Sequence, residues 1–265
     1  MLAPRVLPPQ YTAWNRRWGA PNGNQRIWAR AVAKGMPQLT RRYPRIRGPF
    51  AIQPNSDTRR FEYPWAFSVA PVHPPLRVVE IGGGLAGFQF VLAKQGVEVI
   101  NVDPGTDATG IGWPCDHSSI DRLNAAFGTD VRLVNTTLEH AGIADQSVDR
   151  IYSISTIEHI PTEELPGLAR EMRRILKPGG TVVLTIDLFL NLVPFTRRVE
   201  NRFGWNIDVK AFLDELGLEK TIGTERELNG FPEFDPEDIL ARLEQFCYGQ
   251  YPALVQLVVL EKPAA

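Results

Sequence analysis

From residue 76 onward, short apolar runs alternate with amphipathic stretches in a regular order. The apolar runs predict six strands, at 76–81, 97–103, 131–135, 148–155, 181–187 and 253–262. The amphipathic stretches predict four helices, at 88–96, 119–128, 161–180 and 209–217. Several strands are too apolar to have a solvent-exposed face, which is typical of parallel strands covered by helices on both sides. We therefore predict an α/β fold with a doubly wound, mostly parallel, Rossmann-like sheet.

The first 75 residues have a different character, because they are rich in proline, arginine and aromatic side chains. Within them only residues 24–36 have the periodicity of a helix. Prolines at 71, 74 and 75 mark a natural boundary. We expect an N-terminal extension over 1–75, serving as a lid or in substrate recognition, and a ligand-binding domain over 76–265.

Composition places the chain among ordinary globular proteins, with 43% hydrophobic and 22% charged residues in 265. No apolar stretch approaches the length of a membrane span, and the first residues lack the apolar core of a secretory signal. The only cysteines, Cys115 and Cys247, are far apart, which argues against a disulfide scaffold or a structural zinc site. We expect a cytoplasmic protein and assign no metal ligand.

The net charge of −1 hides an asymmetry along the chain. Residues 1–60 contain twelve Lys and Arg and one acid, Asp57, whereas the remaining 205 residues contain 17 basic and 29 acidic side chains. Such a division indicates two functions, or one surface that neutralises the other.

Behind the first strand, Gly82, Gly84 and Gly87 form the pattern G-x-G-x-x-G. Glycines there let a ligand approach the backbone, and ligands of such sheets lie beyond the carboxyl ends of the strands. Asp103 ends the next strand, 16 residues after Gly87, where a carboxylate can accept hydrogen bonds from ribose hydroxyls. These features serve NAD and other adenosine cofactors equally.

Glu80 favours one kind of cofactor, because it lies two residues before Gly82, where a carboxylate would repel a pyrophosphate. The same carboxylate would attract an ammonium or a sulfonium group. A positively charged cofactor without phosphate, such as S-adenosylmethionine, therefore fits better than NAD.

Here the chain resembles the class I S-adenosylmethionine-dependent methyltransferases, most clearly over residues 76–187. Their first motif, acid-x-Gly-x-Gly-x-x-Gly, stands at 80–87, and their acid after the second strand is Asp103. Their fourth-strand block stands at 147–161 as SVDRIYSISTIEHIP, and the turn before their fifth strand at 176–185 as LKPGGTVVLT. Four motifs in order are far more specific than a lone glycine pattern.

The resemblance implies S-adenosyl-L-methionine as cofactor, S-adenosyl-L-homocysteine as product, and a role for each cofactor-binding residue. Gly82 and Gly84 would lie against the methionine part, Glu80 would orient its amino end, and Asp103 would bind the ribose. An acid that often contacts the adenine is replaced here by Thr137, which leaves Thr137 and the Leu138 backbone as candidates. The remaining candidates for the cofactor site are Ser155, Gly83 and Gly87.

Three residues are candidates for the proton transfer that a hydroxyl acceptor requires. His159 lies in the fourth-strand block, close to the expected acceptor. His117 lies in the loop after the second strand, and Asp187 ends the fifth strand on the acceptor side. For each, an ordinary structural role such as helix capping is the alternative. The segment 188–205 would form the other wall of the acceptor pocket.

The basic N-terminal segment leaves the acceptor open. Arginine forks grip phosphates, and aromatic rings stack on planar or sugar rings, which favours a phosphate-bearing or acidic acceptor; the rings are Trp14, Trp18, Trp28, Tyr43 and Trp65. Nucleic-acid binding, an anionic membrane surface, and a basic arm folded on the acidic domain are alternatives. We expect methyl transfer to oxygen of a small or glycan-like acceptor; a nucleic-acid methyltransferase and a non-catalytic cofactor-binding protein are the alternatives.

Overall fold

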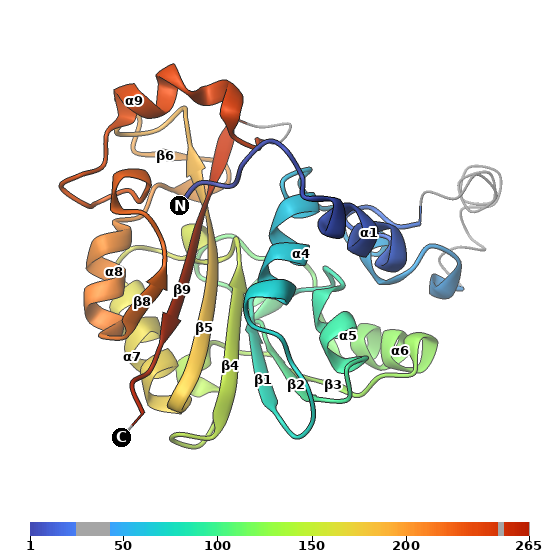
Figure 1. Ribbon diagram of the computed structural model, residues 1–265. Coiled ribbons are helices and arrows are strands. Elements are labelled where there is room, and N and C mark those ends of the chain that lie inside the picture. The colour runs from blue at the N-terminus through green and yellow to red at the C-terminus, as the bar shows by residue number, and fades with distance from the viewer. Residues whose placement is uncertain (25–42, 249–251, 265) are drawn as a thin grey trace.

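The fold is organised around one seven-stranded sheet, which runs through the middle of Figure 1 with helices on either side. The computed structural model describes residues 1–24, 43–248 and 252–264. The strand order is β3-β2-β1-β4-β5-β9-β8, in which β1 to β5 are parallel and β9 runs antiparallel to both of its neighbours. The strands are β1 Arg77–Ile81, β2 Glu98–Val102, β3 Val131–Val134, β4 Val148–Ile154, β5 Leu176–Phe189, β8 Glu219–Ile222 and β9 Ala253–Glu261. The predicted mostly parallel, doubly wound sheet is confirmed.

Both faces of the sheet are buried, because successive strand residues enter two different cores. On β1, Val78 packs with one core and Val79 with the other, and on β4 Tyr152 and Ile151 divide in the same way. The first core includes residues of α5 Phe88–Ala93 and α6 His117–Phe127, and the second includes residues of α7 Leu165–Ile175 and α8 Val209–Leu216. Figure 1 shows these two helix pairs on either side of the strands.

The N-terminal segment joins the first core rather than standing apart. This segment contains helices α1 Pro9–Trp18 and α4 Arg59–Val69. Helix α1 packs on the core with partly buried side chains, and Phe61 and Trp65 of α4 are buried with Val78. The sequence-based expectation of a helix only at 24–36 was wrong for these two helices. Prolines obscured them, since α1 begins with Pro9 and α4 contains Pro64. An internal proline removes a backbone hydrogen bond, and the burial of aromatic side chains in α4 offsets that loss. Most of the predicted helix 24–36 lies outside the described residues.

Two strands differ from the predicted ranges for reasons of pairing. β5 begins at Leu176 rather than 181, because Leu176 pairs with Val148 before the glycine-rich turn. β8, which the sequence did not predict, pairs with one end of β9, and Leu2 bridges to Gln256 along the rest of that edge. The remaining elements are a hairpin of β6 Glu200–Asn201 and β7 Gly204–Trp205, helix α9 Pro236–Ala241, and 3-10 turns η1 Pro44–Ile46, η2 Pro49–Ala51, η3 Gly105–Asp107, η4 Leu138–His140, η5 Ile157–His159, η6 Glu225–Glu227 and η7 Leu243–Gln245.

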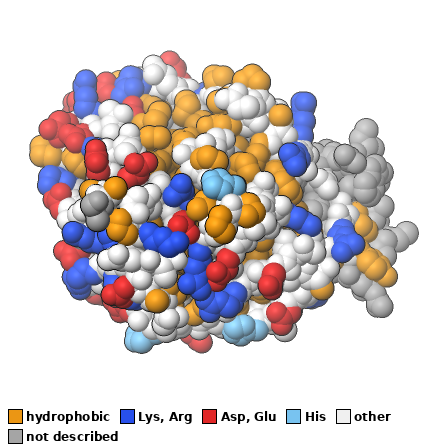
Figure 2. Space-filling model, turned by 60° about the horizontal axis from the view of Figure 1, so that its bottom comes forward, with side chains coloured by type: hydrophobic (Ala, Val, Ile, Leu, Met, Phe, Trp, Pro, Cys, Tyr) orange, Lys and Arg blue, Asp and Glu red, His pale blue; other side chains and the backbone are white. Residues whose placement is uncertain are grey.

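The charge asymmetry of the sequence does not produce a surface of one sign on the face in Figure 2. Hydrophobic side chains gather across its middle and top, and basic and acidic side chains intermingle below them. Several arginines of the basic segment bond to protein groups: Arg45 donates to the carbonyl of Ala125, and Arg47 to that of Asn22. No helix in the described part of the chain is long and apolar enough to cross a bilayer.

Candidate active site

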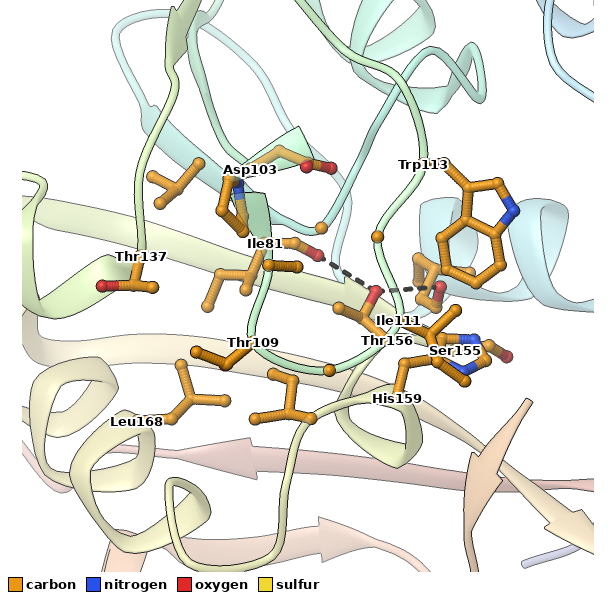
Figure 3. A pocket seen from close by; sticks show the side chains of 18 of the residues that line it. Ile81, Asp103, Thr109, Ile111, Trp113, Thr137, Ser155, Thr156, His159 and Leu168 are labelled. Atoms are coloured by element: carbon orange, nitrogen blue, oxygen red, sulfur yellow. Dashed lines mark hydrogen bonds between the residues drawn. The ribbon is translucent and has the colours of Figure 1, made fainter. Parts of the chain in front are cut away.

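A cavity of about 800 Å³ lies at the carboxyl ends of the parallel strands. This volume is within the range of ligand pockets, roughly 300–1,000 Å³. Its walls include Ile81 at the end of β1, Val102 at the end of β2 and Ile154 at the end of β4. Figure 3 shows two ends of the cavity, with Asp103 and Thr137 at one and Trp113 and His159 at the other.

The glycine loop contributes Gly82 and Ala86 to the cavity wall. A Cβ on Gly82 would lie 2.1 Å from Cγ2 of Thr156, and its φ of +68° is in the left-handed region that favours glycine. Gly83, Gly84 and Gly87 do not line the cavity, because protein atoms occupy the space beside them. A Cβ on Gly87 would lie 2.8 Å from the backbone of Pro49. The loop therefore holds the N-terminal segment as well as facing the cavity.

Asp103 presents its carboxylate to the cavity from the end of β2. One oxygen accepts the backbone N–H of Gly84 and the other that of Gly105, each at 2.7 Å. Burial raises the pKa of Asp103, and these two hydrogen bonds oppose the rise. Each oxygen keeps a lone pair for a further donor, so the side chain is suited to bind a pair of ligand hydroxyls.

Glu80 lies beneath the glycine loop rather than in the cavity wall. It is 2% exposed, its carboxyl carbon would be 2.9 Å from a Cβ on Gly83, and its Oε2 has no hydrogen-bond partner among the described residues. Burial and the nearby charge of Asp103 raise the pKa of Glu80 to about 8. The group is therefore poised to gain or lose a proton near neutral pH, or to respond to a positive charge above the loop.

The loop after β2, residues 104–115, crosses the cavity and closes one side of it. The N–H of Ile111 donates to the carbonyl of His159 at 3.1 Å, and a Cβ on Gly110 would lie 2.0 Å from that oxygen. Thr109 donates its hydroxyl to Glu164 at 2.9 Å. This loop thus connects the end of β2 to the segment after β4.

Thr137, Leu138 and Ser155, expected at the cofactor, all line the cavity. Thr137 and Leu138 lie just after β3, and Figure 3 shows Thr137 at the same end of the cavity as Asp103. Ser155 follows β4 with a φ of +42°, which is unusual for a residue other than glycine. This strained conformation is a mark of functional sites in general.

A buried polar cluster lies under Ser155 and ties α4 to the sheet. Nη1 of Arg59 donates to Glu62 at 2.6 Å and to Ser155 Oγ at 2.7 Å. The hydroxyl of Ser155 is also 2.8 Å from Glu62 and 3.2 Å from Asp187. Asp187 is 1% exposed and does not line the cavity; its N–H donates to Glu158, whose pKa burial and Asp187 raise. Asp187 therefore supports the cavity floor from below.

His159 lies at the other end of the cavity, held by the β6–β7 hairpin. Its Nδ1 bonds to the backbone carbonyl of Phe203, and its ring meets that of Trp113 edge-on, with centroids 4.9 Å apart. A carbonyl only accepts, so Nδ1 carries the proton and Nε2 keeps its lone pair. Burial is the main cause that lowers the pKa of His159 to about 4, which keeps the ring neutral at physiological pH. His159 lines the cavity, and Nε2 is the ring nitrogen that the Phe203 carbonyl leaves unoccupied.

His117, the other histidine candidate, is exposed at the start of α6 and does not line the cavity. Trp14, Trp18, Tyr43 and Trp65 of the N-terminal segment do not line the cavity: Trp65 is 4% exposed in the core, Trp14 packs on Phe50, and Tyr43 is 51% exposed elsewhere. Trp28 lies outside the described residues.

Several cavity residues escaped the sequence analysis, among them Gln53, Arg59 and Trp113. Gln53 accepts the N–H of Leu85 at 2.8 Å, which brings residues 32 positions apart together. None of them belongs to a motif, and their position depends on contacts over long sequence separations. Arg202 and Phe203, from the wall segment predicted at 188–205, do line the cavity.

An adenosine cofactor with a positive charge fits these residues. Asp103 has free acceptor lone pairs in the cavity wall, and Glu80 has an orphaned buried oxygen beneath the loop. No group of three or more His, Cys, Asp and Glu side chains in the described ranges is arranged to hold a metal ion.

Comparisons with known proteins agree with the fold and the motifs. A family described as a methyltransferase domain matches residues 79–184. An uncharacterized methyltransferase of Mycobacterium bovis is 32% identical over 119 residues, which are 44% of this chain and 42% of that protein. Phosphoethanolamine N-methyltransferase 3 of Arabidopsis thaliana is 27% identical over 161 residues, 58% of this chain and 31% of that protein. The matches thus span about two fifths or less of these relatives' length.

Two solved structures share the fold at low sequence identity. The cyclase SpnF has a TM-score of 0.57 and 11% identity over the whole of both chains. The YcgJ protein from Bacillus subtilis has a TM-score of 0.51 and 17% identity, over 77% of this chain and 99% of that chain. These likenesses concern the fold alone, and one fold hosts many reactions.

Proposed function

We propose that this chain, whose residues 79–184 match a methyltransferase-domain family, is a class I S-adenosylmethionine-dependent methyltransferase that transfers a methyl group to a hydroxyl oxygen of a small or glycan-like acceptor. The observation that carries this proposal is the tautomer of His159, whose Nδ1 is held by the Phe203 carbonyl. That contact leaves a proton acceptor at one end of a cavity whose other end holds Asp103.

The cofactor would lie along the cavity from Asp103 to His159. Asp103 would accept hydrogen bonds from the ribose hydroxyls, and Thr137 with the Leu138 backbone would contact the adenine. Gly82 would face the methionine part, and Ser155 would border it from β4. Glu80, Gly83, Gly84 and Gly87 would act indirectly, by shaping the loop and by placing negative charge beneath it.

The bound cofactor supplies a methyl carbon activated by the sulfonium, and transfer forms the oxygen–carbon bond as the carbon–sulfur bond breaks with its electron pair on sulfur. The protein aligns the acceptor oxygen about 3 Å from that carbon. Nε2 of His159 takes the proton that the hydroxyl loses, so the imidazole becomes charged while Nδ1–H stays on the Phe203 carbonyl. The loop over 104–115 and Gln53, which holds the glycine loop, both line the cavity and would limit the access of water to it.

In the same proposal, residues 43–75 act as a lid of the domain over 76–265. Gln53 and Arg59 contribute to the cavity, and Pro49 packs against Gly87. These contacts favour a role in closing the cofactor site over a free arm for nucleic acid.

Two variants test the proposal against its closest alternative. His159→Gln should lower kcat for a hydroxyl acceptor by about 10²–10⁴-fold and leave the affinity for S-adenosylhomocysteine unchanged. His117→Gln, at an exposed histidine outside the cavity, is the matched control and should keep full activity. Calorimetry with S-adenosylhomocysteine and with NAD checks the cofactor. Failure to bind S-adenosylhomocysteine refutes the proposal, and binding without turnover on any acceptor indicates the non-catalytic alternative.

A further inference from the structure

The end of the cavity beside His159 is lined by aromatic rings. Trp113 meets the imidazole edge-on at 4.9 Å between centroids, and Phe203 lines the same cavity from the turn between β6 and β7. Trp113 is 40% exposed, so part of its ring is open to a ligand or solvent. Aromatic surfaces of this kind favour planar ligands, which pack on ring faces and edges.

Arg202, the neighbour of Phe203, places a cation at this wall. Its guanidinium carbon lies 4.5 Å from the centroid of the Phe203 ring, and the side chain lines the cavity. In the described part of the chain it forms no ion pair, whereas Arg170, another arginine of the cavity wall, pairs with Glu215 at 2.7 Å. A guanidinium resting on a ring keeps its donor fork directed outward, ready for a carboxylate or a phosphate.

The acids of the cavity wall come from other places. Asp103 follows β2, Glu139 lies in η4, and Glu163 and Glu164 precede α7. Glu164 accepts the hydroxyl of Thr109. None of these carboxylates belongs to the β6–β7 hairpin, and in the described part of the chain none forms an ion pair with Arg202.

The hairpin that carries Arg202 also holds the proton acceptor. The carbonyl that holds Nδ1 of His159 belongs to Phe203, and Arg202 is the next residue back along the hairpin. An anion bound by Arg202 would therefore lie beside the segment that positions His159. A single small ring can carry both groups.

The basicity of His159 selects the kind of hydroxyl. Its pKa of about 4 makes it a weak base. A phenolic hydroxyl has a pKa of about 10, whereas an alkyl hydroxyl, like water, has a far higher pKa. The difference in pKa between the hydroxyl and the base that accepts its proton is therefore far smaller for a phenol than for a sugar or an alcohol.

We propose that the acceptor is an aromatic hydroxy acid: a flat ring whose hydroxyl faces His159 and whose anionic group is held by Arg202. This inference rests on the proposed function and narrows its acceptor class. The anion is a carboxylate or a phosphate, because the guanidinium fork fits both.

The test uses the full chain with S-adenosylmethionine and a panel of matched compounds. The panel contains hydroxybenzoates, hydroxycinnamates and hydroxyphenyl phosphates, the neutral methyl esters of the acids, and hydroxycyclohexane carboxylates without an aromatic ring. Mass spectrometry measures transfer and locates the methyl group on the phenolic oxygen or on the acid. Arg202→Gln is the test variant, and Arg197→Gln, an exposed arginine outside the cavity wall, is the control.

We expect at least one carboxylate or phosphate of the panel to be methylated on its phenolic oxygen, with kcat/KM at least tenfold above its ester or its alicyclic counterpart. Arg202→Gln should abolish that preference mainly through KM, and Arg197→Gln should retain it. Three results would overturn this inference while leaving the proposed function intact. They are a kcat/KM for the esters equal to that for the acids, a preference for acids that survives Arg202→Gln, and transfer only to neutral phenols or sugar hydroxyls. A panel on which no member is turned over also overturns it. Absence of S-adenosylhomocysteine binding is the separate result that refutes the proposed function itself.

Discussion

A single buried carboxyl, that of Glu80, should make the stability of this protein fall as the pH rises. The side chain is 2% exposed on β1, its Oε2 has no partner among the described residues, and its pKa is raised to about 8 by burial and by Asp103. The change we consider is Glu80→Gln, which keeps the shape of the protonated acid and removes its ability to ionise.

The sign follows from proton linkage. The folded state holds the proton of Glu80 more tightly than the unfolded state, in which the pKa is near 4.5. The stabilisation is therefore complete below pH 4.5 and is lost as the pH rises to about 8. The two pKa values differ by about 3.5, and each unit corresponds to about 1.4 kcal/mol, so the loss reaches at most about 5 kcal/mol. Part of it is shared with Asp103, because the two carboxyls interact.

The assay is urea unfolding of the cofactor-free protein at pH 5, 7 and 9, with the free energies of unfolding compared between variants. Glu80→Gln should be close to the unsubstituted protein at pH 5 and more stable by several kcal/mol at pH 9. Glu98→Gln is the control, since this exposed residue on the neighbouring strand loses little solvation on folding. If the difference between Glu80→Gln and the unsubstituted protein is the same at pH 5 and pH 9, the reasoning about this carboxyl is refuted.

Two further substitutions probe the loop above Glu80. Asp103→Asn should weaken the binding of S-adenosylhomocysteine by about 10–100-fold, as measured by calorimetry, because it replaces a charged acceptor of ligand hydroxyls. The asparagine keeps a side-chain oxygen that can accept the N–H of Gly84 or Gly105. Unchanged affinity would show that Asp103 does not belong to the cofactor site. Gly87→Ala should lower the thermal midpoint by several degrees, since its φ is +101° and its Cβ would lie 2.8 Å from the backbone of Pro49; a midpoint equal to that of the unsubstituted protein would show that the lid does not press on this glycine.

The sheet was predictable from the sequence because its signals are local. Apolar runs such as 97–103 and 148–155 give strands at nearly the same residues, and Asp103 and Ser155 fall in the cavity because they follow strand ends that share one edge. A strand end placed correctly along the chain is enough to place its last side chain at the site. The position of Asp103 at the end of a strand therefore predicts that it lies at this edge of the sheet, without knowledge of any tertiary contact.

The N-terminal helices were not predictable in this way, since their stability comes from contacts and not from pattern. Pro64 interrupts the helical pattern of apolar residues in α4. The helix is buried against β4 and β5 and the residues that follow them, about 90 to 120 positions away in the sequence. The hydrogen bond from Arg59 to Ser155 joins positions 96 apart, and no short motif encodes such a pair.

Cavity residues that belong to sequence motifs and cavity residues that do not lie in different parts of the cavity. The parts of the cavity that the motifs encode, such as Gly82 and Asp103, are those that we propose to face the cofactor. Arg202 and Trp113, which no motif encodes, line the proposed acceptor end; the loop that carries Trp113 bonds to the backbone of His159, and the hairpin that carries Arg202 bonds to its ring. A change in either segment therefore alters the acceptor wall without disturbing the sheet. Under the proposed function, the acceptor must accordingly be inferred from long-range contacts, and here these bring together aromatic rings, a guanidinium without an ion pair among the described residues, and a neutral imidazole.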